Sequence, residues 1–174
     1  MTDFKDIKGF AFDIDGVMTN GGILADLEGQ LYRTYDAKDG FAVRMAAMNG
    51  FPVAVITGAR SQSVRARFNG NGIPPEDIYL GSRDKIVDFD NFCQKHGLKR
   101  SEVMFFGDDI PDLPVILAAG IGVAPADAVD EVKEAADIVS DRPGGRGCVR
   151  KHIEEVMKAQ GQWNFDVSVY KARF

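Results

Sequence analysis

Cysteine is scarce in this chain. Among 174 residues there are two cysteines, Cys93 and Cys148, which lie far apart and have no Cys-x-x-Cys spacing. Such a pair indicates neither a disulfide framework nor a zinc-thiolate site. Two reduced thiols are therefore predicted.

Long apolar runs and excess positive charge are missing too. No stretch is long and apolar enough to cross a bilayer, and the first residues lack the basic and apolar segments of a secretory signal. With 21 Lys and Arg against 26 Asp and Glu, the net charge is -5, which is unsuited to neutralising a nucleic-acid backbone. We expect a cytoplasmic protein that binds neither membranes nor nucleic acid.

The chain does have enough apolar sequence for one core. Its length and its 45% hydrophobic content support one substantial core but are short for two independent domains. Short apolar runs alternate with helix-period segments, which is typical of an α/β fold with a doubly wound, Rossmann-like parallel sheet. We predict a single domain over residues 1–174, ending in a helix and tail over about 147–174.

Apolar runs and helical periodicity locate the elements of this fold. The predicted strands cover residues 9–14, 53–57, 78–80, 103–107, 121–123 and 138–139. The predicted helices cover residues 40–48, 61–69, 85–96, 113–119, 129–135 and 149–158, with C-terminal stops at Gly50, Gly70 and Gly97. Residues 22–35 read as two extended stretches around a turn at Gly29, which predicts a β-hairpin projecting from the sheet.

Polar residues follow several of the apolar runs or begin the next helix. In chain order they are Asp13 and Asp15, Thr57 and Gly58, Lys85, and Asp108 and Asp109. In a parallel α/β sheet, ligands bind beyond the carboxyl ends of the strands. We therefore expect these side chains to meet in one crevice.

Carboxylates gathered in this way repel one another unless a hard cation lies among them. Oxygen ligands beside a small anionic substrate favour Mg²⁺. The implied metal ligands are Asp13, Asp108 and the backbone carbonyl of Asp15. Attack by a carboxylate on a phosphate dianion is opposed by about 8 kcal/mol, at roughly 4 kcal/mol per unit charge, and Mg²⁺ and Lys85 would offset that repulsion.

The same residues suggest a two-step phosphatase. Asp13 is the predicted nucleophile, and its acyl phosphate divides one difficult displacement into two easier ones. Asp15 is the predicted acid in the first step and base in the second. Thr57 and neighbouring backbone N–H groups would hold the phosphoryl oxygens.

As an ordered set, these sequences resemble the four motifs of the haloacid dehalogenase-like phosphatases. The matching segments are Asp13-Ile14-Asp15-Gly16, Thr57-Gly58, Lys85 and Gly107-Asp108-Asp109. Members of that family often insert a cap domain after the first motif or between the second and third. Here the predicted hairpin, helices and strand already fill both intervals, so we expect no cap domain and an open site.

An open site suits either a macromolecular phosphate or a small substrate that a neighbouring subunit covers, because excluding water strengthens the site's electrostatics. The hairpin favours the small substrate. The predicted hairpin carries apolar residues that a lone subunit would expose and that could pair with other copies. They are Ile23, Leu24, Leu27, Leu31 and Tyr32. The alternative is a hairpin folded back on its own core.

Within the family, the chain is similar to the 3-deoxy-D-manno-octulosonate 8-phosphate (KDO 8-phosphate) phosphatases. The similarity covers the small size, the hairpin, Asp39-Gly40 and the segment from Arg142 to Gly147. It implies a small acidic sugar phosphate as substrate, a role in lipopolysaccharide precursor synthesis, and a homotetramer whose glycine-rich segment helps close a neighbour's site.

The substrate's own contacts are predicted from the same regions. Arg60 and Arg146 are candidates for its carboxylate, since a guanidinium can bind a carboxylate through two hydrogen bonds. Gly58 is the third predicted substrate-binding residue. The sequence assigns no role to Asp109 or Asp112, and it leaves open whether the tail closes its own site or a neighbour's.

Two alternatives stay open. A phosphatase of nine-carbon sialic-type acid 9-phosphates would share the same core. A phospho-receiver switch also uses an aspartate, a threonine and a lysine with Mg²⁺, but receivers place the acceptor after a later strand. Here the proposed nucleophile ends the first strand, with a second acid two positions later, which favours turnover over a persistent phosphate.

Overall fold

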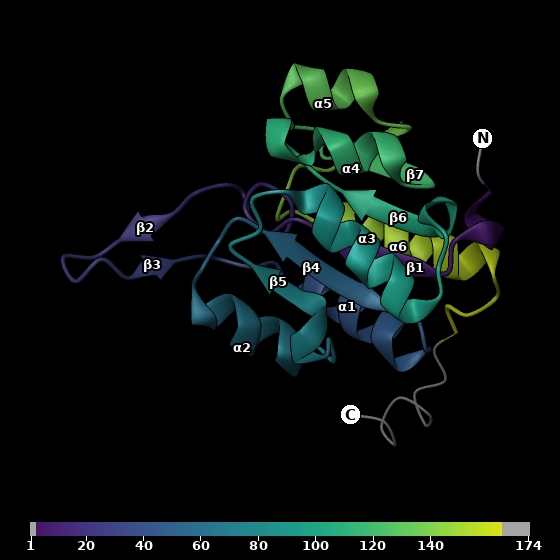
Figure 1. Ribbon diagram of the computed structural model, residues 1–174, viewed down its shortest axis with the longest axis horizontal. Helices are drawn as coiled ribbons and strands as arrows, with labels where there is room; N and C mark the ends of the chain where they lie inside the picture. The colour runs from purple at the N-terminus through teal and green to yellow at the C-terminus, as the bar shows by residue number, and fades with distance from the viewer. Residues whose placement is uncertain (1–2, 165–174) are drawn as a thin grey trace.

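A parallel sheet organises the computed structural model, which describes residues 3–164. Its strands are β1 (Gly9–Phe12), β4 (Val53–Thr57), β5 (Ile78–Leu80), β6 (Val103–Phe106), β7 (Ile121–Ala124) and β8 (Ile138–Val139). They lie in the order β5-β4-β1-β6-β7-β8, and every pairing is parallel (Figure 1). The chain builds outward from β1 to β5 and then returns to the other side of β1 at β6. This confirms the predicted doubly wound α/β fold, in which the order reverses beside β1.

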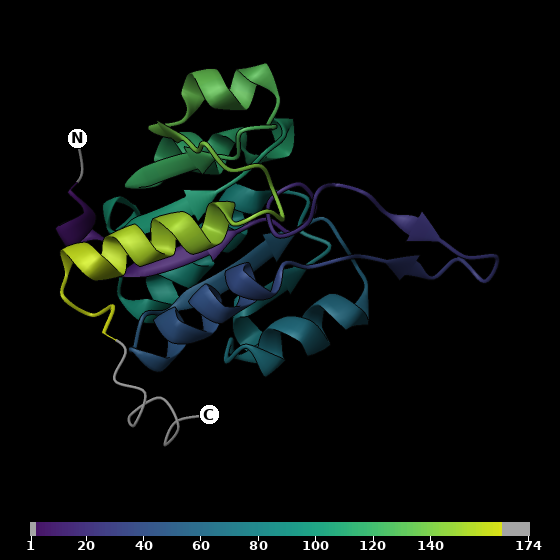
Figure 2. The same cartoon turned by 180° about the vertical axis from the view of Figure 1, so that it is seen from behind.

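Helices cover both faces of the sheet. They are α1 (Ala37–Met48), α2 (Gln62–Gly70), α3 (Lys85–His96), α4 (Leu113–Ala118), α5 (Asp130–Ala135) and α6 (Cys148–Ala159). Figure 1 shows α3 in front of the sheet, and Figure 2 shows α1 and α6 side by side on the opposite face. Short 3₁₀ turns that the sequence did not predict precede several elements, and one of them (Ile110–Asp112) lies in the site.

Alternating strand residues supply the two cores. Phe10 and Phe12 of β1 pack into the cluster that includes residues of α1 and α6. Ala11 faces the opposite cluster, which includes Phe89 and Phe92 of α3. Because successive side chains of a strand point to opposite faces, a strand buried on both sides is apolar throughout. This explains the continuous apolar runs of the sequence.

Capping residues set the helix ends. α1 begins three residues before the predicted start because the Asp36 carboxylate accepts hydrogen bonds from the N–H groups of Lys38 (2.6 Å) and Asp39 (3.3 Å). Gly97 ends α3 in the left-handed conformation, as predicted. The predicted stop at Gly70 is wrong, because this residue is still helical and Gly72 takes the positive φ of 90°.

Asp39 joins α1 to the start of α6. Its side chain is fully buried, and its carboxylate accepts hydrogen bonds from the backbone N–H groups of Gly147 (3.1 Å) and Arg150 (2.7 Å). Burial raises the pKa of Asp39, although both hydrogen bonds favour its charged form. A residue of one helix thus supplies the N-terminal cap of another far along the chain.

The hairpin of β2 (Leu24–Ala25) and β3 (Leu31–Tyr32) extends away from the sheet, as Figures 1 and 2 both show. The turn contains Gly29 at φ 79°, and Asp26 accepts a hydrogen bond from the Gln30 N–H at 2.7 Å. Leu24 is 70% exposed and Leu27 is fully exposed. The predicted projecting hairpin is confirmed, and the alternative of a hairpin folded on its own core is wrong.

The predicted C-terminal region divides into two parts. Its helix is α6, and after it Trp163 packs edge-on against Phe41 of α1. The part of the predicted tail from Phe165 to Phe174 lies outside the described residues. Within residues 3–164, no helix is both long and apolar enough to span a bilayer.

Candidate active site

The predicted catalytic and metal-binding residues meet at the carboxyl edge of the sheet, where the strand order reverses. Asp13 directly follows β1, Thr57 ends β4, Asp108 follows β6, and Lys85 begins α3. An open pocket of about 520 Å³ lies among them. Its lining includes Asp13, Asp15, Thr57, Gly58, Ser82, Arg83, Lys85, Asp108, Asp109 and Asp112.

Lys85 forms an ion pair with Asp13, the acid that directly follows β1. Its ammonium Nζ lies 3.0 Å from Asp13 Oδ2 and 2.7 Å from Asp112 Oδ1, and its side chain is only 6% exposed. A buried lysine keeps its charge only when paired, and the two carboxylates outweigh its burial, so the pKa of Lys85 is raised. The ammonium therefore stays positive beside Asp13.

Asp112 completes this arrangement, and the sequence had given it no role. It is fully buried, and its Oδ2 accepts hydrogen bonds from the backbone N–H groups of Asp108 (3.0 Å) and Asp109 (3.3 Å). It thereby fixes the turn that carries Asp108. The available signal was the spacing, since an acid three residues after Asp109 matches a helix-capping pair.

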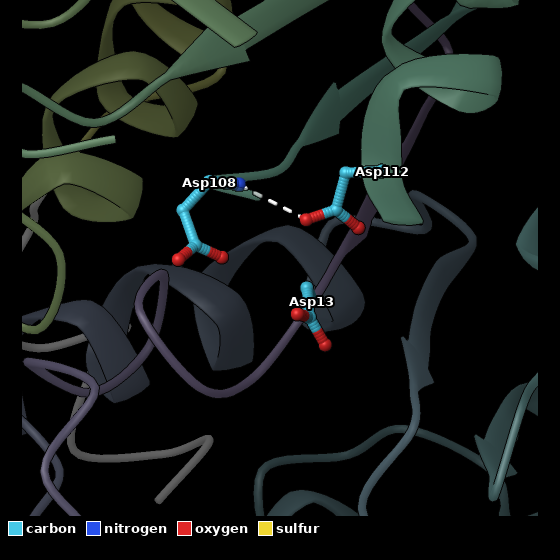
Figure 3. Close-up of side chains that lie close together, drawn as sticks. All are labelled: Asp13, Asp108 and Asp112. Atoms are coloured by element: carbon cyan, nitrogen blue, oxygen red, sulfur yellow. Dashed lines mark hydrogen bonds between the residues drawn. The ribbon is translucent and has the colours of Figure 1, made fainter. Parts of the chain in front are cut away.

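Three carboxylates could hold a divalent cation. Oxygens of Asp13, Asp108 and Asp112 all lie within 4.8 Å of one another, and Figure 3 shows the three side chains drawn together. Asp13 Oδ1 and Asp108 Oδ1 are buried and have no hydrogen-bond partner. Because buried polar atoms are normally paired, these two oxygens fit the ligands of a cation, and an all-oxygen donor set fits Mg²⁺.

The pKa values of these acids support the same conclusion. Burial, with a further contribution from Asp112, raises the pKa of Asp13 to about 6 despite the neighbouring Lys85. Burial and the charges of Asp112 and Asp13 raise the pKa of Asp108 to about 8. A bound cation reverses this effect because it favours the charged carboxylates. The carbonyl oxygen of Asp15 stays a predicted ligand.

Glycines allow two loops to approach the acids closely. Gly16 has φ 89°, and a Cβ atom there would lie 1.9 Å from Asp108 Oδ2. Similarly, a Cβ on Gly144 would lie 1.8 Å from the carbonyl oxygen of Gly16. The N–H of Gly145 donates to the Val17 carbonyl at 2.8 Å. The glycine-rich loop before α6 therefore packs on the loop that carries Asp15.

Asp15 has a partner that the sequence analysis missed. Arg33, just after β3, donates from Nε to Asp15 Oδ1 (2.6 Å) and from Nη2 to Oδ2 (2.9 Å). The Arg33 side chain is 3% exposed and that of Asp15 is 26% exposed. No local spacing indicates this pair, because it forms only where the hairpin leaves the domain.

Thr57 and Arg83 provide further groups for a substrate. Thr57 is buried, and its Oγ1 accepts a hydrogen bond from the Ala59 N–H at 3.2 Å, so its hydroxyl hydrogen remains available to an oxygen in the pocket. Gly58 follows at the pocket surface. Arg83 is exposed on the same lining and was not predicted.

The two predicted carboxylate-binding arginines do not reach this pocket within one chain. Arg60 is exposed and lines a groove of about 580 Å³ between the hairpin and the start of α2. Arg146 is exposed and lines a separate pocket of about 560 Å³ beside Lys38 and Arg150. Their substrate role stays a prediction.

Comparisons with known proteins agree with this geometry. The sequence pattern of the haloacid dehalogenase-like hydrolases matches residues 62–148. The chain is also 33% identical over 162 residues to the KDO 8-phosphate phosphatase KdsC of Salmonella typhi, covering 93% of this chain and 85% of that protein. The chain belongs to the haloacid dehalogenase-like hydrolases. The resemblance read from its four motifs is therefore confirmed.

Solved structures place this hydrolase among similar proteins. The KDO 8-phosphate phosphatase of Moraxella catarrhalis, in complex with magnesium, phosphate and KDO, matches with a TM-score of 0.87 and 31% identity, covering 98% of this chain and 95% of that one. A hydrolase of the same superfamily from Legionella pneumophila matches with a TM-score of 0.91 and 34% identity, covering 98% and 92%.

Proposed function

We propose that this hydrolase is a Mg²⁺-dependent KDO 8-phosphate phosphatase. The observation that carries the proposal is the environment of Asp13, which lies 3.0 Å from the Lys85 ammonium and within 4.8 Å of two further carboxylates. This arrangement supplies a nucleophile, a fixed positive charge and a cation site at one point of the sheet. The relatives named KDO 8-phosphate phosphatase support the substrate.

In the first step, an Asp13 carboxylate oxygen attacks phosphorus and the bond between phosphorus and the sugar oxygen breaks. The electron pair of that bond stays on the sugar oxygen, which takes a proton from Asp15. In the second step, a water oxygen attacks phosphorus while Asp15 takes its proton. The bond from phosphorus to Asp13 then breaks, which releases inorganic phosphate and restores both acids.

The other residues have supporting roles in this proposal. Bound Mg²⁺ supplies positive charge against the repulsion between carboxylates and phosphate. Asp13, Asp108 and the Asp15 carbonyl would hold it, and Asp112 would orient both Lys85 and the turn of Asp108. Thr57 and the backbone at Gly58 would bind phosphoryl oxygens, and Arg83 offers a further cation at the pocket edge.

We propose a cytoplasmic homotetramer in which neighbouring copies help to cover the open site, with each chain working as one domain. The exposed apolar hairpin supports association, and the open pocket has no cap above it in the described residues. Arg60 and Arg146, which lie away from Asp13 in the same chain, remain candidates for the substrate carboxylate. The enzyme's place is in the synthesis of lipopolysaccharide precursors.

A phosphate-release screen tests the substrate. Purified enzyme with Mg²⁺ is offered KDO 8-phosphate, a nine-carbon sialic-type acid 9-phosphate and neutral sugar phosphates. We expect the highest kcat/KM for KDO 8-phosphate and loss of activity when a chelator removes the metal. A higher kcat/KM for the nine-carbon acid would favour the alternative substrate. A phosphate that persists on Asp13 without turnover would instead favour a receiver-like switch.

A further inference from the structure

The side chain of Arg33 connects the hairpin to the active site. Arg33 follows β3 at the base of the hairpin, and its guanidinium binds both oxygens of Asp15, at 2.6 and 2.9 Å. The two residues are 18 positions apart, with Asp15 before the hairpin and Arg33 after it. The contact is therefore a specific link between the hairpin and the proposed acid.

Burial makes this link more rigid than a surface ion pair. The side chain of Arg33 is 3% exposed and that of Asp15 is 26% exposed. In contrast, the pair of Arg100 and Asp90 has the same two-bond geometry but is 48% and 45% exposed. Exposed pairs of that kind contribute little, because solvent screens them and the side chains are free to move.

The geometry leaves Asp15 able to transfer a proton. A carboxylate has about four acceptor positions, and a two-bond arginine contact uses two of them. The contact also fixes the plane of the carboxylate, since both oxygens are held. General acids must lie within about 2.6–3.2 Å of the atom that they protonate, and a displacement of about 1 Å can lower a rate roughly 100-fold.

We propose that Arg33 is a positioning residue that holds the Asp15 carboxylate in place for proton transfer to the sugar oxygen. This inference rests on the proposed function, in which Asp15 is the acid of the first step. Arg33 does not touch the reacting atoms in this account. Because this contact joins the base of the hairpin to Asp15, a change in the orientation of the hairpin base would also change the alignment of the Asp15 carboxylate.

Two substrates with different leaving groups distinguish a positioning role of Arg33 from a merely structural one. A sugar alkoxide needs a proton as it departs, whereas p-nitrophenolate is stable as an anion and does not. We compare kcat/KM because this ratio includes only the steps up to and including the first irreversible one. Hydrolysis of the acyl phosphate, which is the second step, therefore does not affect it. We expect Arg33→Gln to lower kcat/KM for KDO 8-phosphate roughly 10- to 100-fold and to change kcat/KM for p-nitrophenyl phosphate by less than about threefold.

A double-mutant comparison separates positioning from direct binding of the sugar acid. If Arg33 acts through Asp15, Arg33→Gln adds less than about a threefold loss in an Asp15→Asn background. A further large loss for KDO 8-phosphate in that background would overturn the proposal, because the arginine would then bind substrate itself. An equal loss for both substrates in the single variant would overturn it as well.

Two further variants keep the test decisive. Arg33→Lys retains the charge but offers a point contact in place of the two-bond one, so we expect an intermediate loss confined to KDO 8-phosphate. Arg100→Gln removes the exposed pair and should leave both kcat/KM values unchanged. If wild-type enzyme fails to hydrolyse KDO 8-phosphate, the proposed substrate fails, and the sugar phosphate that it does hydrolyse replaces it in the same comparison.

Discussion

Two acids of the active site keep their protons to unusually high pH when no cation is bound. Burial, more than any neighbouring charge, raises the pKa of Asp13 to about 6 and that of Asp108 to about 8. An ordinary aspartate in an unfolded chain loses its proton near pH 4. Each site carboxylate therefore opposes folding at neutral pH unless a cation compensates.

Replacing Asp108 by asparagine should show that the Asp108 carboxylate destabilises the folded state at neutral pH. Between about pH 4 and pH 8 the native protein binds more protons at this position than the unfolded chain does, so its stability falls as pH rises. Asparagine does not titrate. We expect metal-free Asp108→Asn to melt roughly 2–4 °C above wild type at pH 8 and close to it near pH 4, measured by circular dichroism.

Magnesium should stabilise the wild-type protein more than the Asp108→Asn protein. Bound to wild type it favours the folded state and raises the melting temperature, whereas the Asp108→Asn protein should respond weakly. Asp109→Asn is the matched control, because Asp109 is adjacent but exposed. Parallel melting curves across pH for wild type and Asp108→Asn would contradict the account.

Asp13→Asn should abolish turnover without unfolding the protein. The amide cannot form the acyl phosphate, so we expect kcat to fall at least roughly 1000-fold. The substitution preserves shape and removes a buried charge, so the thermal midpoint should be unchanged or higher. Phosphate release and circular dichroism check both expectations, and clear turnover by a pure preparation would refute the nucleophile assignment.

Sequence alone predicted where the site acids gather but not all of their partners. Asp13, Thr57 and Asp108 could be placed because each follows an apolar strand and parallel strands end at one edge. Arg33 could not, because its contact with Asp15 depends on how the hairpin leaves the fold. Arg60 and Arg146 lie in other pockets of the chain. The sequence could not show this, because residue type alone does not determine where a side chain points.

At the scale of elements, Asp39 connects α1 to the N-terminus of α6 by hydrogen bonds. Removing its carboxylate leaves the N–H groups of Gly147 and Arg150 without their partner. We expect Asp39→Ala to lower the free energy of unfolding by about 1–3 kcal/mol. It should also lower kcat, because the loop before α6 packs on Gly16 and Thr19. Urea unfolding and phosphate release measure the two effects.

Asp36 offers a matched comparison for Asp39. It caps α1 through the N–H groups of Lys38 and Asp39 and is less buried. Asp36→Ala should cost about 1 kcal/mol and leave kcat unchanged. Equal effects of the two substitutions on kcat would show that the α6 junction has no special connection to the site.

Most helices and strands were predictable because their patterns are strong. α3 runs from Lys85 to His96 as predicted, with a left-handed glycine after it. Errors occurred where capping side chains decide the boundary, as at Asp36 before α1. The 3₁₀ turn Ile110–Asp112 was missed because so short an element has no periodicity.

For the whole molecule, the hairpin governs the expected assembly. We expect wild-type protein to sediment as a concentration-dependent oligomer, with a tetramer at micromolar concentration. Leu24→Lys places a charge on the exposed apolar arm and should shift the population toward monomer. Val87→Lys, on α3 at 50% exposure, is the control and should leave the oligomer intact. A wild-type protein that stays monomeric would contradict this expectation.

At this scale the architecture could be predicted from the sequence, whereas the homotetramer stays a prediction. The doubly wound sheet followed from six apolar runs, and the projecting hairpin from two extended stretches around a glycine. Whether copies join through that hairpin depends on surfaces of several chains, which the pattern within one chain does not determine.

The glycine-rich loop against Gly16 also has a consequence for biosynthesis. Gly144 and Gly145 contact the segment that carries Asp15, although they are made more than a hundred residues later. While the ribosome still holds this loop and α6, the segment after β1 lacks its packing partner. A nascent chain can thus form its first strands early, but its active site is completed only after the glycine-rich loop has been made.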